Sequence, residues 1–173
     1  MALSAEVCLQ LDTWGAWERV EQLCRETLGW LPERSEKAAT FLHLLGIVAQ
    51  QRGDYDAALD GYRKSLAIEE ELGNRAGMAS SMSQIGILLT SRGDPAAGVA
   101  WNLQSLALRR ALRVPQVRIN LTWLRRQRAL LGAARFAAVL AEHLDPPSQQ
   151  AVEKMLEQAE ESASPPPDAQ GPR

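Results

Sequence analysis

The feature that most constrains the fold is an internal repeat with a spacing of forty residues. The segment GDYDAALDGYRKSL, residues 53–66, returns as GDPAAGVAWNLQSL, residues 93–106. When residues 41–70 are moved along by this spacing, identical residues coincide at Gly46, Gly53, Asp54, Ala57, Ser65, Leu66 and Ala67. A fixed period in this range is typical of solenoids, in which each repeat packs against its neighbours.

Each copy has the pattern of two helices joined by a tight turn. Leu42, Leu45 and Ala49 recur at helical spacing, and the second half of the copy continues in the same way. Between the halves, Gly53 is suited to the left-handed conformation that ends a helix, and Asp54 is suited to cap the next one. We therefore expect antiparallel helix pairs.

Several positions of this pattern are hallmarks of one family. In the first copy they are Leu45-Gly46, Gly53, Tyr55, Ala58, Tyr62 and Ser65-Leu66. The pattern resembles the tetratricopeptide repeat, in the long form of about forty residues found in bacterial arrays. The resemblance implies an all-α fold, a right-handed superhelical solenoid of stacked helix pairs. The second copy departs from the pattern, because Gly98 stands where the first copy has Ala58 and Asn102 where it has Tyr62. The adjacent Trp101 either fills the space of the missing tyrosine ring or forms an exposed anchor.

Two looser units flank the two clear copies. We expect one repeat domain over residues 1–160, followed by a tail at 161–173 that is rich in Pro, Ser and Gly and is expected to be disordered. Within the domain, the expected units are about 3–33, 34–73, 74–113 and 114–144, with a capping helix at 147–160. Trp14 and Trp30 are expected to help close the first end.

Composition narrows the class of protein. The formal net charge is only −2, and 46% of residues are hydrophobic, which suits a globular chain. Cys8 and Cys24 are too few for a disulfide scaffold and form no metal-binding pair. The N-terminal segment lacks the basic and apolar regions of a signal peptide, and no apolar stretch is long enough to span a membrane. We expect a cytoplasmic protein.

Motifs for catalysis are missing from the sequence. It contains no phosphate-binding loop, zinc-protease motif, nucleophile elbow or dinucleotide fingerprint. His43 and His143 lie far apart, and His43 is expected to be a partly exposed helical residue. The acidic triplet at residues 69–71 is expected to be a solvated helix end. We predict no catalytic, cofactor-binding or metal-binding residues.

The resemblance also implies a binding surface, because the first helix of each pair lines the concave groove in such arrays. The positions it assigns to this partner-binding groove are Thr40, His43, Ile47, Gln50, Gln51, Ser80, Ser83, Ile87, Thr90, Ser91, Thr122, Arg125 and Arg126. This lining is small, polar and weakly apolar. It suits an extended or helical peptide better than a closed small-molecule pocket.

Charge and aromatic residues indicate a second candidate binding region in the C-terminal half. Residues 101–145 carry eight arginines against Glu142 and Asp145, a net charge of +6, whereas the remainder carries −8. The functional interpretation is a patch that binds an acidic peptide or, less favoured, nucleic acid. The alternative is ordinary solvated helix surface together with internal pairing to the acidic front half, and it is favoured for Arg109 and Arg110 at a helix end. Trp123 would be a strong binding residue if it faced the groove.

The sequence therefore predicts a non-catalytic adaptor or scaffold that binds a peptide or partner segment in the concave groove. Two alternatives stay open. One is a nucleic-acid-associated regulator that uses the arginine-rich region, and the other is an oligomerisation module that self-associates through the ends of the solenoid.

Overall fold

The computed structural model describes residues 16–161, so the start of the first expected unit and the expected disordered tail lie outside the described residues. Within this range the chain forms helices and no strand. The helices are α2 (Ala16–Leu28), α3 (Glu36–Gln51), α4 (Tyr55–Leu72), α5 (Arg75–Ser91), α6 (Pro95–Ala111), α7 (Val117–Leu131), α8 (Ala133–His143) and α9 (Pro146–Glu161).

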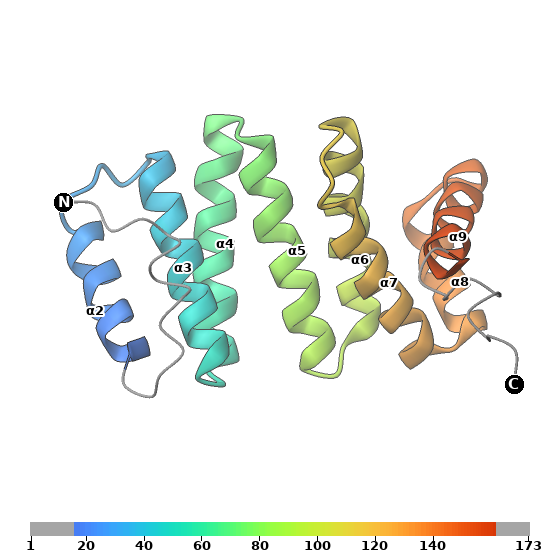
Figure 1. Ribbon diagram of the computed structural model, residues 1–173, viewed down its shortest axis with the longest axis horizontal. Helices are drawn as coiled ribbons and strands as arrows, with labels where there is room; N and C mark the ends of the chain where they lie inside the picture. The colour runs from blue at the N-terminus through green and yellow to red at the C-terminus, as the bar shows by residue number, and fades with distance from the viewer. Residues whose placement is uncertain (1–15, 162–173) are drawn as a thin grey trace, which may run out of the picture.

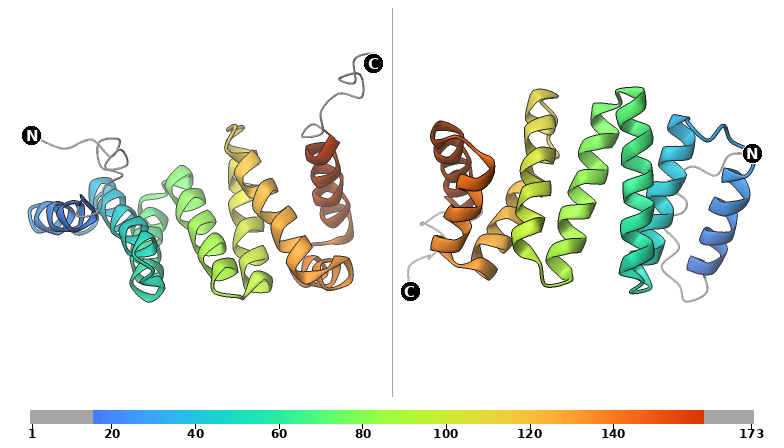
Figure 2. Two further views of the ribbon diagram at one scale, coloured as in Figure 1. Left: turned by 60° about the horizontal axis from the view of Figure 1, so that its bottom comes forward. Right: turned by 180° about the vertical axis from the view of Figure 1, so that it is seen from behind.

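The helices form consecutive hairpins, α3–α4, α5–α6 and α7–α8, with α2 before them and α9 after them. The hairpins follow one another along the long axis of the molecule (Figures 1 and 2). Helices α2 to α7 contact chiefly their neighbours in sequence, whereas α8 also contacts α6 and α9 also contacts α7. In Figure 1, α7 lies in front of α6 and α9 in front of α8. This order of contacts is that of a linear helical solenoid.

The turn within each of the two clear copies is built in the same way. Gly53 and Gly93 adopt φ angles of 79° and 91°, in the left-handed region that glycine tolerates best. The carboxylate of Asp54 accepts a hydrogen bond from the Ala57 amide, at 3.1 Å. Asp94 caps α6 in the same way, because its carboxylate accepts a hydrogen bond of 3.0 Å from the Ala97 amide. The expected helix break and helix cap are confirmed in both copies.

Glycine also sets the spacing between the two helices of a pair. A Cβ atom on Gly46 would lie 2.6 Å from Cε1 of Tyr62 and 3.2 Å from the carbonyl oxygen of Ala58. Forty residues on, a Cβ atom on Gly86 would lie 2.9 Å from Nδ2 of Asn102 and 2.9 Å from the carbonyl oxygen of Gly98. The two copies therefore place their glycines in equivalent surroundings, at the same crossing of first and second helix.

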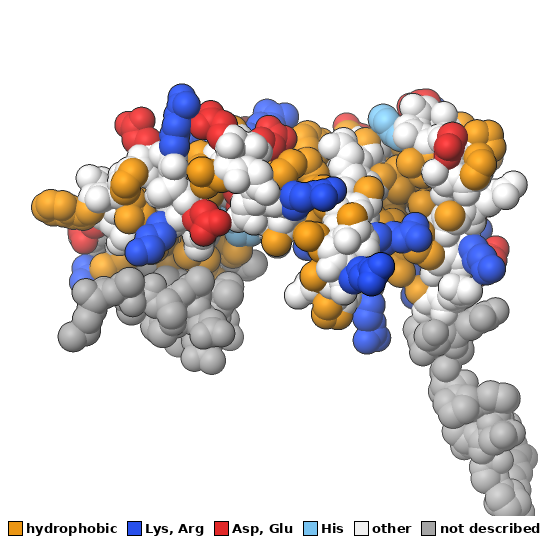
Figure 3. Space-filling model, turned by 90° about the horizontal axis from the view of Figure 1, so that it is seen from above, with side chains coloured by type: hydrophobic (Ala, Val, Ile, Leu, Met, Phe, Trp, Pro, Cys, Tyr) orange, Lys and Arg blue, Asp and Glu red, His pale blue; other side chains and the backbone are white. Residues whose placement is uncertain are grey.

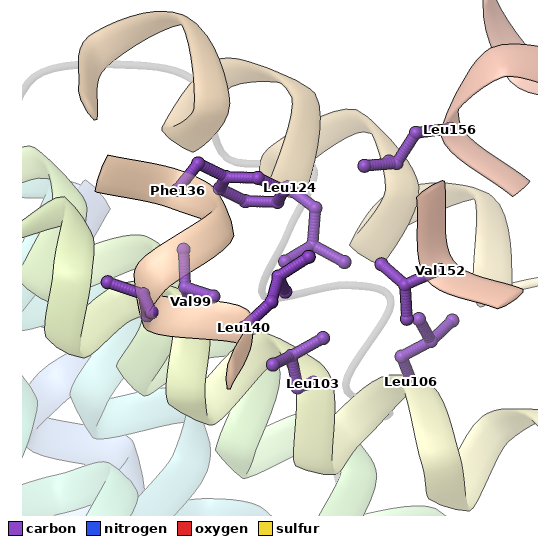
Figure 4. Close-up of a cluster of buried hydrophobic side chains, with 9 residues drawn as sticks. Val99, Leu103, Leu106, Leu124, Phe136, Leu140, Val152 and Leu156 are labelled. Atoms are coloured by element: carbon purple, nitrogen blue, oxygen red, sulfur yellow. The ribbon is translucent and has the colours of Figure 1, made fainter. Parts of the chain in front are cut away.

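The core runs along the whole stack rather than sitting at its centre. It consists of an N-terminal cluster around Val20 and Val48, a middle cluster around Tyr62 and Ile85, and a C-terminal cluster. Figure 4 shows the C-terminal cluster, in which α6, α7, α8 and α9 contribute Val99, Leu103, Leu106, Leu124, Phe136, Leu140, Val152 and Leu156. Because α9 supplies two of these side chains, it covers the apolar side of the last hairpin.

The tryptophans divide between the core and the surface. Trp17 packs on the N-terminal cluster, and Trp101 packs on the middle cluster, so Trp101 is a packing residue and not an exposed anchor. Trp30 is 88% exposed in the loop between α2 and α3. The expectation that it helps to close the end of the stack is therefore wrong for Trp30, and Trp14 lies outside the described residues.

Candidate functional site

The groove residues expected on α3 divide between the surface and the packing. Thr40 and Gln51 are exposed, and Ile47 is half-buried. Gln50 accepts a hydrogen bond of 2.8 Å from the hydroxyl of Tyr62. The ring of His43 is half-buried, 5.2 Å from the ring of the same tyrosine. These last two side chains therefore join α3 to α4 within one hairpin.

On α5, the expected residues are more deeply placed. Ser83 and Thr90 are buried, with 2% and 6% of their surface exposed, whereas Ile87 is half-buried and Ser91 exposed. The hydroxyl of Thr90 accepts a hydrogen bond of 2.7 Å from Nε2 of Gln127 on α7. The structure thus brings α5 and α7, the first helices of successive hairpins, side by side.

On α7, Thr122 and Arg125 line a groove of about 590 Å³ between α7 and α9. The other lining residues are the apolar Val117, Leu121, Met155 and Ala159 together with Arg118 and Gln158. Thr122 is exposed, and its hydroxyl donates to the carbonyl of Arg118 in its own helix. The groove therefore combines apolar side chains with guanidinium groups, which suits a partner with both apolar and acidic groups.

Arg126 lies on the other flank of α7. Its guanidinium carbon is 5.0 Å from the centre of the Trp123 ring, which is the geometry of a cation–π contact. Trp123 is partly exposed, and it lies four residues before Gln127, which contacts α5. The tryptophan and arginine thus sit on the flank of α7 that is turned toward α5. We call the exposed side of α3, α5 and α7, represented by Thr40, Gln51, Ser91, Thr122 and Arg126, the first-helix face.

A second depression, of about 610 Å³, was not expected from the sequence. It lies between α2, α3 and α4, and Leu42, Leu45 and Ala49 of α3 line it. Its charged rim is largely neutralised, because Glu21 contacts both Arg25 and Arg52 at 2.7 Å. This depression lies on the side of α3 away from His43 and Ile47. The α3 residues that line it point about half a helical turn away from these two side chains.

A buried polar cluster joins α3, α4 and α5. The Ser81 hydroxyl lies 3.2 Å from Oε2 of Glu69, 3.3 Å from the hydroxyl of Ser65 and 3.1 Å from Nδ1 of His43. Burial raises the pKa of Glu69 to about 7, against the opposing effect of its hydrogen bonds with Ser81 and Ser65. Burial lowers the pKa of His43 to about 4. Glu69 is only 6% exposed, so the expectation that residues 69–71 form a solvated helix end is wrong for this residue.

Ser, His and Glu in contact raise the question of a nucleophilic triad. In a triad the histidine lies between the nucleophile and the carboxylate, so that it can accept the proton of the nucleophile. Here the Ser81 hydroxyl lies between His43 and Glu69. Ser81 has 0% of its surface exposed, which leaves a substrate no approach. The cluster therefore has the geometry of an internal packing contact.

An equivalent cluster lies one repeat further on. Arg109, forty residues after Glu69, is 6% exposed and donates to Oδ1 of Asn120 at 2.8 Å and to the carbonyl of Gln116 at 3.1 Å. Burial lowers its pKa. The expectation that Arg109 is solvated surface is therefore wrong. The signal in the sequence was its position: four residues after Ser105, as Glu69 is four residues after Ser65, on the core side of the second helix.

Among residues 16–161, no group of three or more His, Cys, Asp or Glu side chains is arranged to hold a metal ion. No helix in the same range is long and apolar enough to cross a membrane.

Comparison with known proteins bears on this fold directly. Residues 37–111, from α3 to α6, match the family model described as tetratricopeptide repeat. Among solved structures, the chain is similar to a protein of Podosopora anserina that is described as a kinesin light chain with nearly identical TPR-like repeats, with a TM-score of 0.56 and 17% identity. That similarity covers 85% of this chain and 77% of the other, and it concerns the fold alone. No curated protein matches the sequence.

The expected fold class is confirmed: the chain is an all-α helical repeat protein with a TPR-like solenoid fold. The matched residues comprise the two hairpins that carry Gly46 and Gly86 in equivalent positions. Tetratricopeptide repeats generally mediate protein–protein interactions and are generally non-catalytic.

Proposed function

We propose that this chain is a non-catalytic adaptor or scaffold that binds a segment of a partner protein on the first-helix face. The observation that carries the proposal is the groove between α7 and α9, in which an apolar lining lies beside Thr122 and Arg125. An apolar centre with a polar edge is the usual anatomy of a protein interface. The tetratricopeptide repeat match supports the same function.

Within this face, the exposed residues are the proposed contacts. They are Thr40, Gln51, Ser91, Thr122 and Arg126, with Arg125 at the edge of the groove and Ile47 and Ile87 half-buried beneath. Five groove residues of the sequence prediction remain: Ser80 is half-buried and donates to the carbonyl of Ala76 in its own helix, and His43, Gln50, Ser83 and Thr90 are engaged in packing or buried. Their proposed role is to hold the first helices in place beneath the partner.

Two further features of the proposal rest on the sequence. The forty-residue spacing fits the long repeat type of bacterial arrays. We also propose a cytoplasmic location, which is consistent with the low number of cysteines.

Site-specific photo-crosslinking in cells tests the proposed face. A photoreactive amino acid is placed at Ser91 or Thr122 on first helices, and at the control positions Gln104 or Ala137, which are exposed on the second helices α6 and α8. We expect protein adducts from the first pair of positions and few from the control pair. Adducts that form equally from both pairs would contradict the assignment of the face.

The same experiment distinguishes the alternatives. When the photoreactive amino acid is also placed on the end helices α2 and α9, adducts whose mass shows a second copy of this chain would indicate a module that self-associates through its ends. Adducts that nuclease treatment removes would indicate a nucleic-acid-associated protein. Either result would replace the proposed adaptor function.

A further inference from the structure

The charges of α5 and α7 are of one sign. The two helices carry five arginines and no Asp or Glu: Arg75, Arg118, Arg125, Arg126 and Arg128. The helices α2 and α4, by contrast, carry eight acidic residues. In Figure 3, the acidic side chains of the N-terminal half are interspersed with basic ones, and the C-terminal half shows a group of Lys and Arg side chains with some acidic ones beside it.

Several acidic side chains of the N-terminal half are paired within the molecule. Asp56 pairs with Arg92 at 2.7 Å and Asp60 with Lys64 at 2.6 Å, in addition to the two ion pairs of Glu21. On α7, no acidic side chain of the described residues lies within ion-pair distance of Arg118, Arg126 or Arg128. Among the described residues, these guanidinium groups are therefore available for an acidic group of a partner.

An apolar stripe accompanies these arginines. Ile119, Trp123, Arg126 and Leu130 follow one another at intervals of four, three and four residues, which places them on one flank of α7. This flank lies away from the buried Leu124, and it leaves Ile119 43% and Leu130 59% exposed. We call these four residues the α7 stripe.

We propose that the α7 stripe docks an acidic protein segment that also carries an apolar side chain. This inference rests on the proposed function and names the chemistry of the partner. Trp123 with Ile119 and Leu130 would receive the apolar side chain, because a tryptophan buries a large area at little entropic cost. Arg126 lies over one face of the indole ring, with its guanidinium carbon 5.0 Å from the ring centre, and would donate its N–H groups to a carboxylate of the partner.

A protein segment fits the stripe better than a nucleic acid. Proteins that bind single strands use successive aromatic rings whose faces are open to the bases. The stripe has one aromatic residue, Trp123, and Arg126 already covers one face of its ring. The exposed aliphatic side chains of Ile119 and Leu130 gain from burial against an apolar side chain, which a phosphate backbone does not supply.

Selection from a library of short randomised peptides displayed on phage tests the inference with the intact chain. We expect the selected peptides to be enriched in Asp and Glu and to contain at least one large apolar residue. Trp123→Ala should weaken the binding of the synthesised peptides by about 30-fold. Arg126→Ala should weaken it by about 2- to 5-fold, and by less at high salt.

Matched variants control for unspecific effects. Trp30→Ala removes a tryptophan that is 88% exposed in a loop away from the stripe, and Arg135→Ala removes an exposed arginine of α8. Both should bind the peptides as the unmodified chain does. Leu130→Ser serves as a second stripe variant, because this exposed side chain can be replaced without opening the core. A circular dichroism spectrum and a thermal midpoint for each variant show that its fold is retained.

The outcomes separate this inference from the proposed function. Selected peptides that are neutral or basic, or that bind the Trp123→Ala and Leu130→Ser variants as tightly as the unmodified chain, would overturn the acidic-segment inference and leave a protein-binding function in place. Failure to select any peptide would contradict both. A labelled single-stranded oligonucleotide that binds more tightly than the peptides, and loses binding in the stripe variants, would show that the stripe is a nucleic-acid site instead.

Discussion

At Gly46 the backbone of α3 lies directly against the ring of Tyr62, and a side chain there has no space. Alanine favours the helix by about 1 kcal/mol over glycine. Its Cβ atom, however, would lie 2.6 Å from a ring that is fully buried and held by a hydrogen bond to Gln50. Overpacking of this kind costs about 1 to 3 kcal/mol. We expect Gly46→Ala to lower the free energy of unfolding in urea.

The matched control is Gly29→Ala. Gly29 is exposed, and a Cβ atom there would lie 3.4 Å from the nearest atom, the carbonyl oxygen of Glu26. We expect this substitution to change the free energy of unfolding by less than Gly46→Ala does. Equal effects of the two would mean that the close helix crossing is not what requires a glycine at position 46.

Glu69 makes the stability depend on pH in a direction that can be checked. Its pKa is raised to about 7 from an ordinary value near 4.5, so the folded chain retains a proton that the unfolded chain releases between these two pH values. The contribution of Glu69 is therefore greatest below about pH 4.5 and is lost as the pH rises through about 7. His43 acts in the opposite sense: its lowered pKa favours the fold above about pH 6.5, and this contribution is lost as the pH falls toward about 4.

We expect Glu69→Gln to become more stable relative to the unmodified chain as the pH rises from about 4.5 to about 7, because glutamine stays neutral. The measurement is the difference in the free energy of urea unfolding between the two proteins at several pH values. Above about pH 8 the difference should be constant. A difference that does not change with pH over this range would show that Glu69 is ionised in the folded protein throughout.

At the scale of the helix, the two caps offer a comparison inside one molecule. Asp54 and Asp94 each accept a hydrogen bond from the amide three residues on, in helices of similar length. We expect Asp54→Ala and Asp94→Ala each to cost about 1 kcal/mol of stability. Hydrogen exchange should be faster in the first turn of α4 or α6, respectively. A large effect from one cap and none from the other would contradict the equivalence of the two hairpins.

The same scale shows what the sequence could and could not predict. Helix ends such as those at Gly53 and Asp54 were predictable, because a cap depends on residues a few positions away. The burial of Glu69 and Arg109 depends instead on Ser81 and Asn120, which belong to the next hairpin.

The candidate site was also predictable only in part. The register of the repeat assigns residues to the first helices, but it does not show which of them the neighbouring helix covers. Thr90 was assigned to the groove, yet the side chain of Gln127 on α7 reaches over to it. Thr122 was assigned in the same way, and it lies exposed beside the groove between α7 and α9.

At the scale of the molecule, the linear order of contacts predicts that a destabilising substitution in one helix lowers the local stability of the neighbouring helices only. Arg109 joins α6 to α7 through Asn120 and the carbonyl of Gln116. Arg109→Met would leave Oδ1 of the buried Asn120 without this partner, at a cost of about 1 to 3 kcal/mol. We expect faster hydrogen exchange in α7, α8 and α9, with α3 and α4 close to the unmodified chain, because repeat stability is a sum of local terms. Uniformly faster exchange along the whole chain would show a single cooperative unit instead.

The central claim is that a partner protein segment binds the first-helix face, and the five isoleucines of the chain provide a direct measurement of it. Ile87 and Ile119 lie on first helices next to the proposed contacts, Ile68 is half-buried on the second helix α4, and Ile85 is fully buried. We predict that adding a peptide obtained from the phage selection shifts the methyl NMR signals of Ile87 and Ile119. The signals of Ile68 and Ile85 should stay in place. Shifts at Ile68 with none at Ile87 or Ile119 would contradict the claim.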